Sequence, residues 1–231
     1  MSRWIRWAIC WPSKKKERYA DILVKLINEA QGEPVEYFNK GIGANAISPR
    51  SPGYAQSRKP SAMERYQNDV ITNRPDLVVL AYGLNDMRAG MEVKAFIAEL
   101  EIIVRDVKAA ADPVIVLVNV YHMPRYDWHP PYDRGSVAAT WKYNRALRAL
   151  AERTGCLYAD VYRAEGRADW VVHQDSVHAN KVGNVLIANE IFQVLATHCS
   201  GLSKAINEQN ENTAWTRGTR ANRYGPNRPA K

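Results

Sequence analysis

Two kinds of apolar pattern alternate along the chain. Apolar positions three and four residues apart predict amphipathic helices, and short unbroken apolar runs predict strands buried on both faces. The expected helices are residues 18–30, 62–72, 93–110, 136–153 and 180–198, and the expected strands are residues 34–39, 77–81, 114–120 and 156–161. Strands that alternate with helices of this length favour an α/β fold, a parallel sheet with helices on both faces.

Two segments between these elements read as irregular loops. Residues 47–61 are rich in Pro, Ser and Gly, and residues 121–135 are rich in aromatic residues and Pro. In parallel α/β folds, ligands bind beyond the carboxyl ends of the strands. The residues directly after each strand are therefore the first candidates for a functional site.

Three short polar motifs lie at such places. Asn39-Lys40-Gly41 and Gly83-Leu84-Asn85-Asp86 each follow an expected strand, and Asp175-Ser176-Val177-His178 precedes the last helix. Acyl transfer needs an imidazole to take a proton, a carboxylate to orient it, and N–H donors for the oxyanion. The spacing of Asp175 and His178 lets both side chains converge from one turn. The motifs together favour this chemistry.

These motifs, in this order, resemble those of the SGNH hydrolases, also called the GDSL esterase/lipase family, over roughly residues 19–198. The resemblance implies a three-layer α/β/α sandwich of the flavodoxin-like kind with a central parallel sheet. It implies that Gly41, through its backbone N–H, and Asn85, through its side-chain amide, form the oxyanion hole. His178 is then the general base and Asp175 its orienting carboxylate. No metal and no organic cofactor is implied.

The chain departs from this family at its first block, a Gly-Asp-Ser-Leu motif that supplies the nucleophilic serine. Only Trp4–Trp11, Pro12 and Ser13 stand in its place. One interpretation makes Trp4–Trp11 a degenerate first strand and Ser13 the nucleophile. The other treats residues 1–17 as not native to the family, so that the chain lacks a nucleophile.

The expected function follows these two interpretations. With Ser13 as nucleophile, the chain is a serine esterase that hydrolyses a small-molecule or carbohydrate ester, with a short acyl or acetyl group. Without it, the chain is an inactive or truncated protein of the same fold that binds an acylated or sugar ligand. The sequence does not indicate an oligomeric state.

The positive charge of the chain is concentrated at its ends. The formal net charge is +8, and residues 1–18 carry six basic and one acidic side chain while residues 203–231 carry six basic and two acidic ones. A nucleic-acid-binding domain would show a basic stripe on its folded part, so no nucleic acid is expected. We expect an atypical segment at 1–17, one domain at 18–200 and a disordered basic tail at 201–231.

Cysteine content and hydropathy exclude several further classes. Cys10, Cys156 and Cys199 form no CxxC pair, so neither a zinc ribbon nor a disulfide framework is expected. No apolar run approaches the roughly 18 residues that span a bilayer. The first residues do not form a recognisable signal peptide, so the expected address is cytoplasmic or unknown.

Simpler interpretations stand beside three of the motifs. Asp175 and His178 could be a helix-capping pair. Gly41–Ala46 fits a dinucleotide-binding pattern, but prolines follow where a helix should begin. Four loop residues could be metal ligands, although a substrate-facing loop with an aromatic wall is the simpler explanation; they are His122, Asp127, His129 and Asp133.

Overall fold

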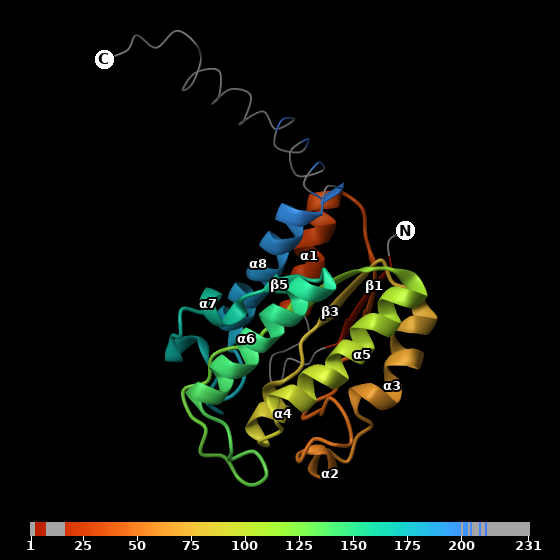
Figure 1. The fold of residues 1–231 in the computed structure, drawn as a ribbon. Coiled ribbons are helices and arrows are strands. Elements are labelled where there is room, and N and C mark those ends of the chain that lie inside the picture. The colour runs from red at the N-terminus through yellow and green to blue at the C-terminus, as the bar shows by residue number, and fades with distance from the viewer. Residues whose placement is uncertain are drawn as a thin grey trace, which may run out of the picture.

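The centre of the structure is a parallel sheet. The computed structural model describes residues 3–7, 17–199, 201, 202, 204, 208 and 211. Five parallel strands pair in the order β2-β1-β3-β4-β5 (Figure 1). The strands are β1 (Arg3–Trp7), β2 (Glu36–Asn39), β3 (Leu77–Leu80), β4 (Val114–Val118) and β5 (Leu157–Ala159).

Helices connect the strands and cover both faces of the sheet. The longer ones are α1 (Tyr19–Gln31), α3 (Ala62–Asp69), α5 (Val93–Ala111), α6 (Val137–Thr154) and α8 (Lys181–His198). The short ones are α2 (Tyr54–Ser57), η1 (Ile71–Asn73), α4 (Leu84–Arg88), α7 (Val161–Ala164) and η2 (Asp169–Val171). The expected long helices lie within a few residues of the observed ones, whereas α2, α4 and α7 were not predicted.

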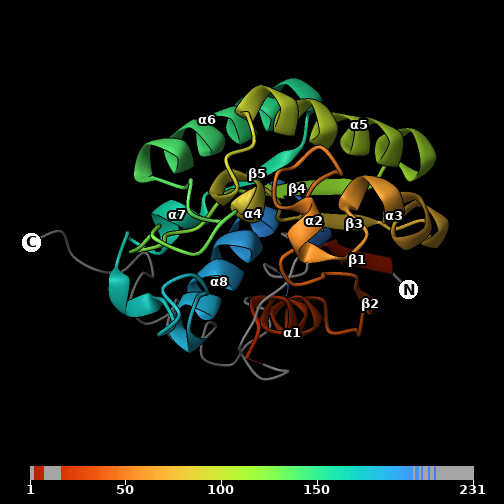
Figure 2. The same ribbon diagram turned by 90° about the horizontal axis from the view of Figure 1, so that it is seen from below.

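Alternate residues of the strands point to two separate cores. In β3, Val78 and Leu80 belong to the core that faces α3, α5 and α6, and Leu77 and Val79 belong to the core that faces α1 and α8. Figure 2 shows α5 and α6 on one side of the sheet and α1 and α8 on the other. The period of two explains why this strand is apolar at every position. The predicted three-layer α/β/α sandwich is confirmed.

The first described residues of the chain, strand β1, join the sheet. Trp4 pairs with Tyr37 of β2 on one side and with Leu77 of β3 on the other. Residues 3–7 therefore supply the strand between β2 and β3, as the first interpretation of Trp4–Trp11 expects. Ser13 and the rest of residues 8–16 lie outside the described part of the chain.

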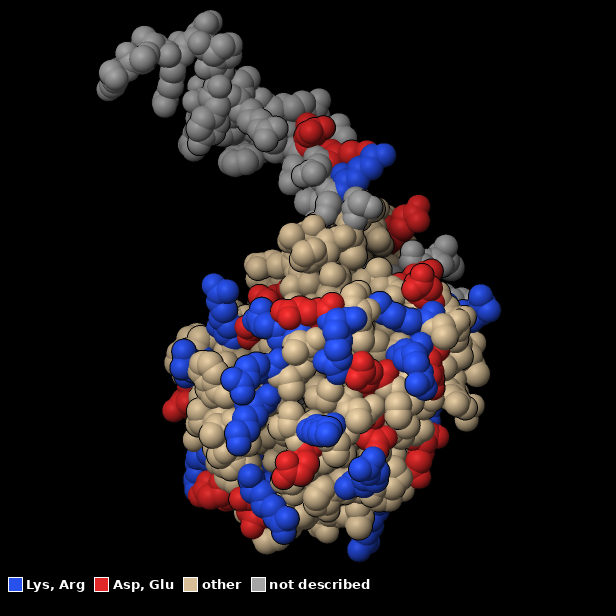
Figure 3. All heavy atoms as spheres, viewed as in Figure 1, with Lys and Arg blue, Asp and Glu red and all other residues tan. Residues whose placement is uncertain are grey.

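The described residues of the C-terminal segment are helical. Residues 201, 202, 204, 208 and 211 have helical geometry, and Leu202 is buried in the core formed with α1 and α8. Most of the tail expected to be disordered lies outside the described residues, and there the expectation stays a prediction. On the described surface in Figure 3, basic and acidic side chains are interspersed. Within the described residues, no helix is both long and apolar enough to cross a membrane.

Candidate active site

A cavity opens at the carboxyl ends of the strands, where the candidate motifs meet. It is lined by Tyr19, 42–45, 81–85, 118–121, His178 and Ile187. The chain runs from β1 to β2 on one side and later places β3 on the other side, so the cavity lies at a topological switch point, the usual ligand position in this fold class. Of the predicted site residues, Asn85 and His178 line the cavity directly.

Asp175 orients the ring of His178 at the edge of this cavity. The Asp175 Oδ2 atom lies 2.7 Å from His178 Nδ1, and Asp175 Oδ1 accepts the backbone N–H groups of Val177 and His178, each at 2.9 Å. Burial alone would raise the pKa of Asp175, but the hydrogen bonds from His178 and Val177 outweigh it and lower the pKa. The charged carboxylate therefore accepts the Nδ1 proton and leaves Nε2 as a proton acceptor.

The turn that carries this pair is held by the backbone. The N–H of His173 donates to the carbonyl of His178 at 2.6 Å, and Ser176 adopts a left-handed conformation with φ 61°. Helix α8 begins after the turn and is capped by Asn180, whose side chain accepts the N–H groups of Val182 and Gly183. The capping interpretation of Asp175 and His178 is therefore wrong, because Asn180 fills that position.

Helix α4 brings Asn85 into the cavity directly after β3. Gly83 begins the helix with φ 111°, and a Cβ there would lie 3.0 Å from the Phe96 ring. Only glycine therefore allows so sharp a transition from strand to helix. The Asn85 side-chain amide donates one hydrogen bond to the carbonyl of Asn45 at 3.2 Å. An amide has two N–H donors, so one remains for a ligand.

Asp86, the last residue of the second motif, holds the loop beneath the cavity. It is fully buried, and its Oδ1 atom accepts the backbone N–H of Ile47 at 3.0 Å. Burial raises the pKa of Asp86 to about 6, and the hydrogen bond from Ile47 opposes the rise. Asp86 therefore fixes residues 45–47, which follow the first motif.

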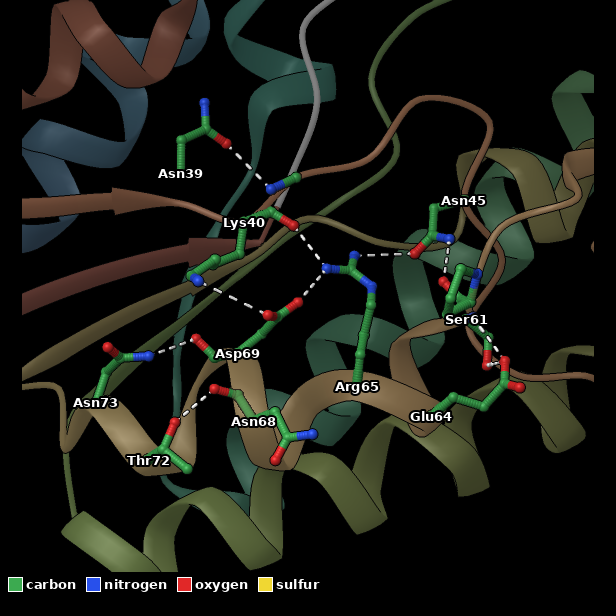
Figure 4. A network of polar contacts seen from close by, with 12 residues as sticks. Asn39, Lys40, Asn45, Ser61, Glu64, Arg65, Asn68, Asp69, Thr72 and Asn73 are labelled. Carbon is green, nitrogen blue, oxygen red and sulfur yellow. Dashed lines mark hydrogen bonds and ion pairs between the residues drawn. The ribbon is translucent and has the colours of Figure 1, made fainter.

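Arg65 fixes the remainder of that loop. Its guanidinium donates to the Lys40 carbonyl at 2.7 Å and to Asn45 Oδ1 at 3.0 Å (Figure 4). It also donates to the Tyr82 hydroxyl at 2.8 Å. Asp69, one turn further along α3, neutralises the guanidinium at 2.6 Å. This network joins α3 to both ends of residues 40–45 and gives the loop one conformation.

The two glycines of this loop, Gly41 and Gly43, differ in their position relative to the cavity and in whether their N–H groups are already bonded. The Gly41 N–H donates to Asn39 Oδ1 at 3.1 Å, as Figure 4 shows, and Gly41 does not line the cavity. Gly43 lines the cavity, and none of the described hydrogen bonds uses its N–H. The expectation that Gly41 supplies an oxyanion donor does not fit this geometry, because its donor already has an acceptor.

Sequence reasoning also missed Asn119, which lines the cavity directly after β4. Its side chain donates to the Tyr158 hydroxyl at 2.9 Å and to Asp160 Oδ1 at 2.8 Å, and it accepts the N–H of Tyr162 at 3.1 Å. Asn119 therefore ties β4 to the segment after β5. The predicted strand 114–120 included Asn119, so its position just beyond the strand became apparent only in the structure.

The geometry of the site agrees with a comparison of the sequence with protein families. A profile of the GDSL-like Lipase/Acylhydrolase family matches residues 8–186. The chain belongs to this family. A search of curated protein sequences finds no match.

Solved structures share the fold of this GDSL-like chain at low sequence identity. Axe2, an acetylxylan esterase from Geobacillus stearothermophilus, is 18% identical with a TM-score of 0.65, over 84% of this chain and 94% of Axe2. TesA is 14% identical with a TM-score of 0.67, over 85% of this chain and 99% of TesA. At such low sequence identity, these structural similarities show a common fold and nothing more specific.

In this GDSL-like chain, the described part of the cavity contains no alcohol or thiol nucleophile. Its described lining residues include no Ser, Thr or Cys. Ser13 lies outside the described residues, between the end of β1 and the start of α1. The last residue of β1, Trp7, pairs with Leu80 at the end of β3, three residues before Gly83. Strand β1 therefore ends at the same edge of the sheet as the cavity.

Proposed function

We propose that this chain hydrolyses carboxylic esters through a covalent acyl-enzyme, with Ser13 as the nucleophile. The hydrogen bond between Asp175 and His178 at the cavity edge carries the proposal, because it prepares Nε2 to accept a proton. The family match supports acyl hydrolysis in general. The position of residues 8–16 after β1 supports a nucleophile from that segment.

The proposed reaction has two steps. His178 Nε2 takes the hydroxyl proton, and the oxygen attacks the ester carbonyl. The amide of Asn85 and the N–H of Gly43 stabilise the oxyanion, and the alcohol leaves with the proton from His178. Water then attacks the acyl-enzyme by the same route and releases the carboxylic acid. Asp175 stays ionised throughout.

We propose short acyl groups, including acetyl groups on carbohydrate, as the substrate class. Axe2 is an acetylxylan esterase, and its catalytic mutants replace a serine, an aspartate and a histidine. The aspartate and the histidine are three positions apart in that protein, as Asp175 and His178 are here. Tyr121 lines the cavity and Trp128 stands exposed on the same loop, which suits a ring-shaped alcohol.

A second candidate function is binding without catalysis. It is favoured by the absence of a Gly-Asp-Ser-Leu block from the sequence. Such a protein would keep the cavity and the oxyanion donors and would bind an acylated or sugar ligand.

A fluorophosphonate label separates the two functions. Intact mass and peptide mapping are compared for the wild type and for the Ser13→Ala, Cys10→Ala and His178→Ala variants. We expect one adduct on Ser13 that persists in Cys10→Ala and is lost in Ser13→Ala and His178→Ala. The Cys10 variant is included because residues 8–16 contain one serine and one cysteine.

Two outcomes contradict the proposal. An adduct that maps to Cys10 would make the enzyme a thiol esterase with the same base. No adduct, under conditions that saturate an ordinary serine esterase, would leave binding without catalysis as the function.

A further inference from the structure

Arg88 is a buried cation beside the candidate active site. It ends α4, three residues after Asn85, so both side chains lie on one side of the helix. Arg88 is only 5% exposed. Burial lowers the pKa of the Arg88 guanidinium, and the charges of Tyr121, Tyr132 and Asp175 oppose this decrease. Arg88 is not among the residues that line the cavity, and it lies one turn of α4 beyond Asn85, which lines it.

No protein group described in the structure pairs with this cation. The Arg88 guanidinium has no hydrogen bond or ion pair with any described residue, and its Nε atom is buried without a partner. Its close neighbours are the rings of Trp128 and Tyr132, whose centroids lie 5.3 Å and 5.4 Å from its central carbon. Aromatic rings attract a cation but accept no strong hydrogen bond, so the buried Nε donor stays without an acceptor.

Asp175 and Asp86 form no described hydrogen bond or ion pair with Arg88, although Asp86 Oδ2 is itself buried without a partner. Asp175 accepts two backbone N–H groups and bonds the ring of His178. Asp86, on the same helix as Arg88, accepts the N–H of Ile47. An unpaired buried guanidinium is unfavourable, and it is most easily tolerated where an anion from outside completes its pairing.

We propose that Arg88 binds an anionic oxygen group of the ester substrate, so that the preferred substrates are esters of carboxylate-bearing sugars. The guanidinium fork matches a carboxylate with two parallel hydrogen bonds. Trp128 is 40% exposed, which leaves part of its ring free to pack against the sugar. This inference rests on the proposed esterase function for the ester itself, whereas the binding of the carboxylate does not depend on catalysis.

Positive charge continues in a neighbouring groove of about 530 Å³. Asn119 lines both this groove and the cavity, which places the two side by side. Arg145, Arg148, Arg163 and Arg167 line the groove. The one acidic residue among its described lining, Asp160, is paired with Arg148 at 2.8 Å. The arginines of this groove would attract further carboxylates of a longer acidic sugar chain.

Calorimetric titration with unreactive sugars tests the inference without hydrolysis. D-glucuronate and D-glucose are titrated into the wild type and into the Arg88→Gln, Arg88→Lys and Arg125→Gln variants. We expect glucuronate to bind the wild type roughly tenfold or more tightly than glucose. Arg88→Gln should abolish the difference and Arg88→Lys should keep part of it. Arg125→Gln is the matched control, because Arg125 is exposed on the same loop and pairs with Asp127.

Two results would overturn the inference. The first is equal binding of both sugars by the wild type, a measurement that needs no variant to fold. The second is a preference for glucuronate that survives in Arg88→Gln, which would give Arg88 only the role of holding the aromatic loop. A wild type that prefers glucuronate through Arg88 but hydrolyses neither acetylated glucuronate nor acetylated glucose would refute the proposed function and leave the inference standing.

Discussion

At the scale of single residues, the Asn85 amide is held in place by one N–H group and keeps the other for a ligand. Asn85 uses one amide N–H on the carbonyl of Asn45, and this bond fixes the direction of the other. Preorganised donors of this kind act mainly on the transition state, because the ground-state carbonyl carries less charge.

Asn85→Ala should therefore lower kcat about 10²–10³-fold and change KM little. Hydrolysis of 4-nitrophenyl acetate under steady-state conditions measures both constants. Asn68→Ala is the matched control, because Asn68 is exposed on α3. A loss confined to KM would mean that Asn85 binds the substrate and takes no part in stabilising the oxyanion.

Gly83 is constrained both by its backbone conformation and by its neighbours. Gly83→Ala should lower the free energy of unfolding by about 3 kcal/mol, since the new methyl group meets Phe96 and φ is 111°. Gly166 has φ 65° but nothing within 4 Å of the position a Cβ would take, so Gly166→Ala should cost only about 1 kcal/mol. Urea unfolding of both variants measures the difference, and equal losses would contradict the steric argument.

At the scale of elements, Glu165 joins the loop after β4 to helix α7. Its Oε2 atom accepts the N–H of His122 at 2.9 Å, and its Oε1 atom is buried without a partner. Burial raises the pKa of Glu165 to about 8, and the hydrogen bond from His122 opposes the rise. The folded protein therefore keeps this proton at pH values where the unfolded chain releases it.

Glu165 should consequently make the fold less stable as pH rises from about 4.5 to about 8. Glu165→Gln removes this loss, so the variant should exceed the wild type at pH 9 by up to several kcal/mol and match it near pH 4. Thermal unfolding across this pH range measures the effect.

Glu101→Gln is the matched control for that measurement. Glu101 is partly exposed, and its hydrogen bond from Arg153 lowers its pKa. The control variant should therefore be slightly less stable at neutral pH, by less than about 1 kcal/mol. A Glu165→Gln variant that behaves like this control would contradict the buried, protonated state of Glu165.

At the scale of the whole molecule, the sheet depends on its first strand. Among the described strands β2 pairs with β1 alone, so without β1 it loses its one described partner in the sheet. A chain that begins at residue 18 should not unfold cooperatively, whereas removal of residues 212–231 should leave the melting temperature nearly unchanged. Near-ultraviolet circular dichroism during heating tests both truncations. Cooperative melting of the shorter domain would mean that residues 18–200 fold without β1.

Most of the fold was predictable from the sequence because the buried strands are apolar at every position. Leu77–Leu80 could be assigned from its residues alone. Arg3–Trp7 could not, because two arginines interrupt its apolar residues and only its pairing with β2 and β3 makes it central. Short helix α4 was missed because its sequence reads as a turn.

The candidate site was predictable where a motif fixes local geometry, as at Asp175 and His178. It was not predictable where a long-range contact decides. Gly41 and Gly43 are equivalent in sequence, and they differ because the side chain of Asn39 occupies one N–H. Arg88 gave no signal, since only the folded structure reveals that a buried cation lacks a partner.

The position of β1 also sets an order for folding. It is synthesised before both of its neighbours in the sheet, and Trp4 must wait for Leu77 before both edges of its strand are paired. Contacts between residues so distant in sequence form slowly, because the intervening chain must be closed into a loop first. The nascent chain therefore carries an unpaired central strand until β3 has been synthesised, and this is the interval in which chaperones that bind extended apolar segments would recognise it.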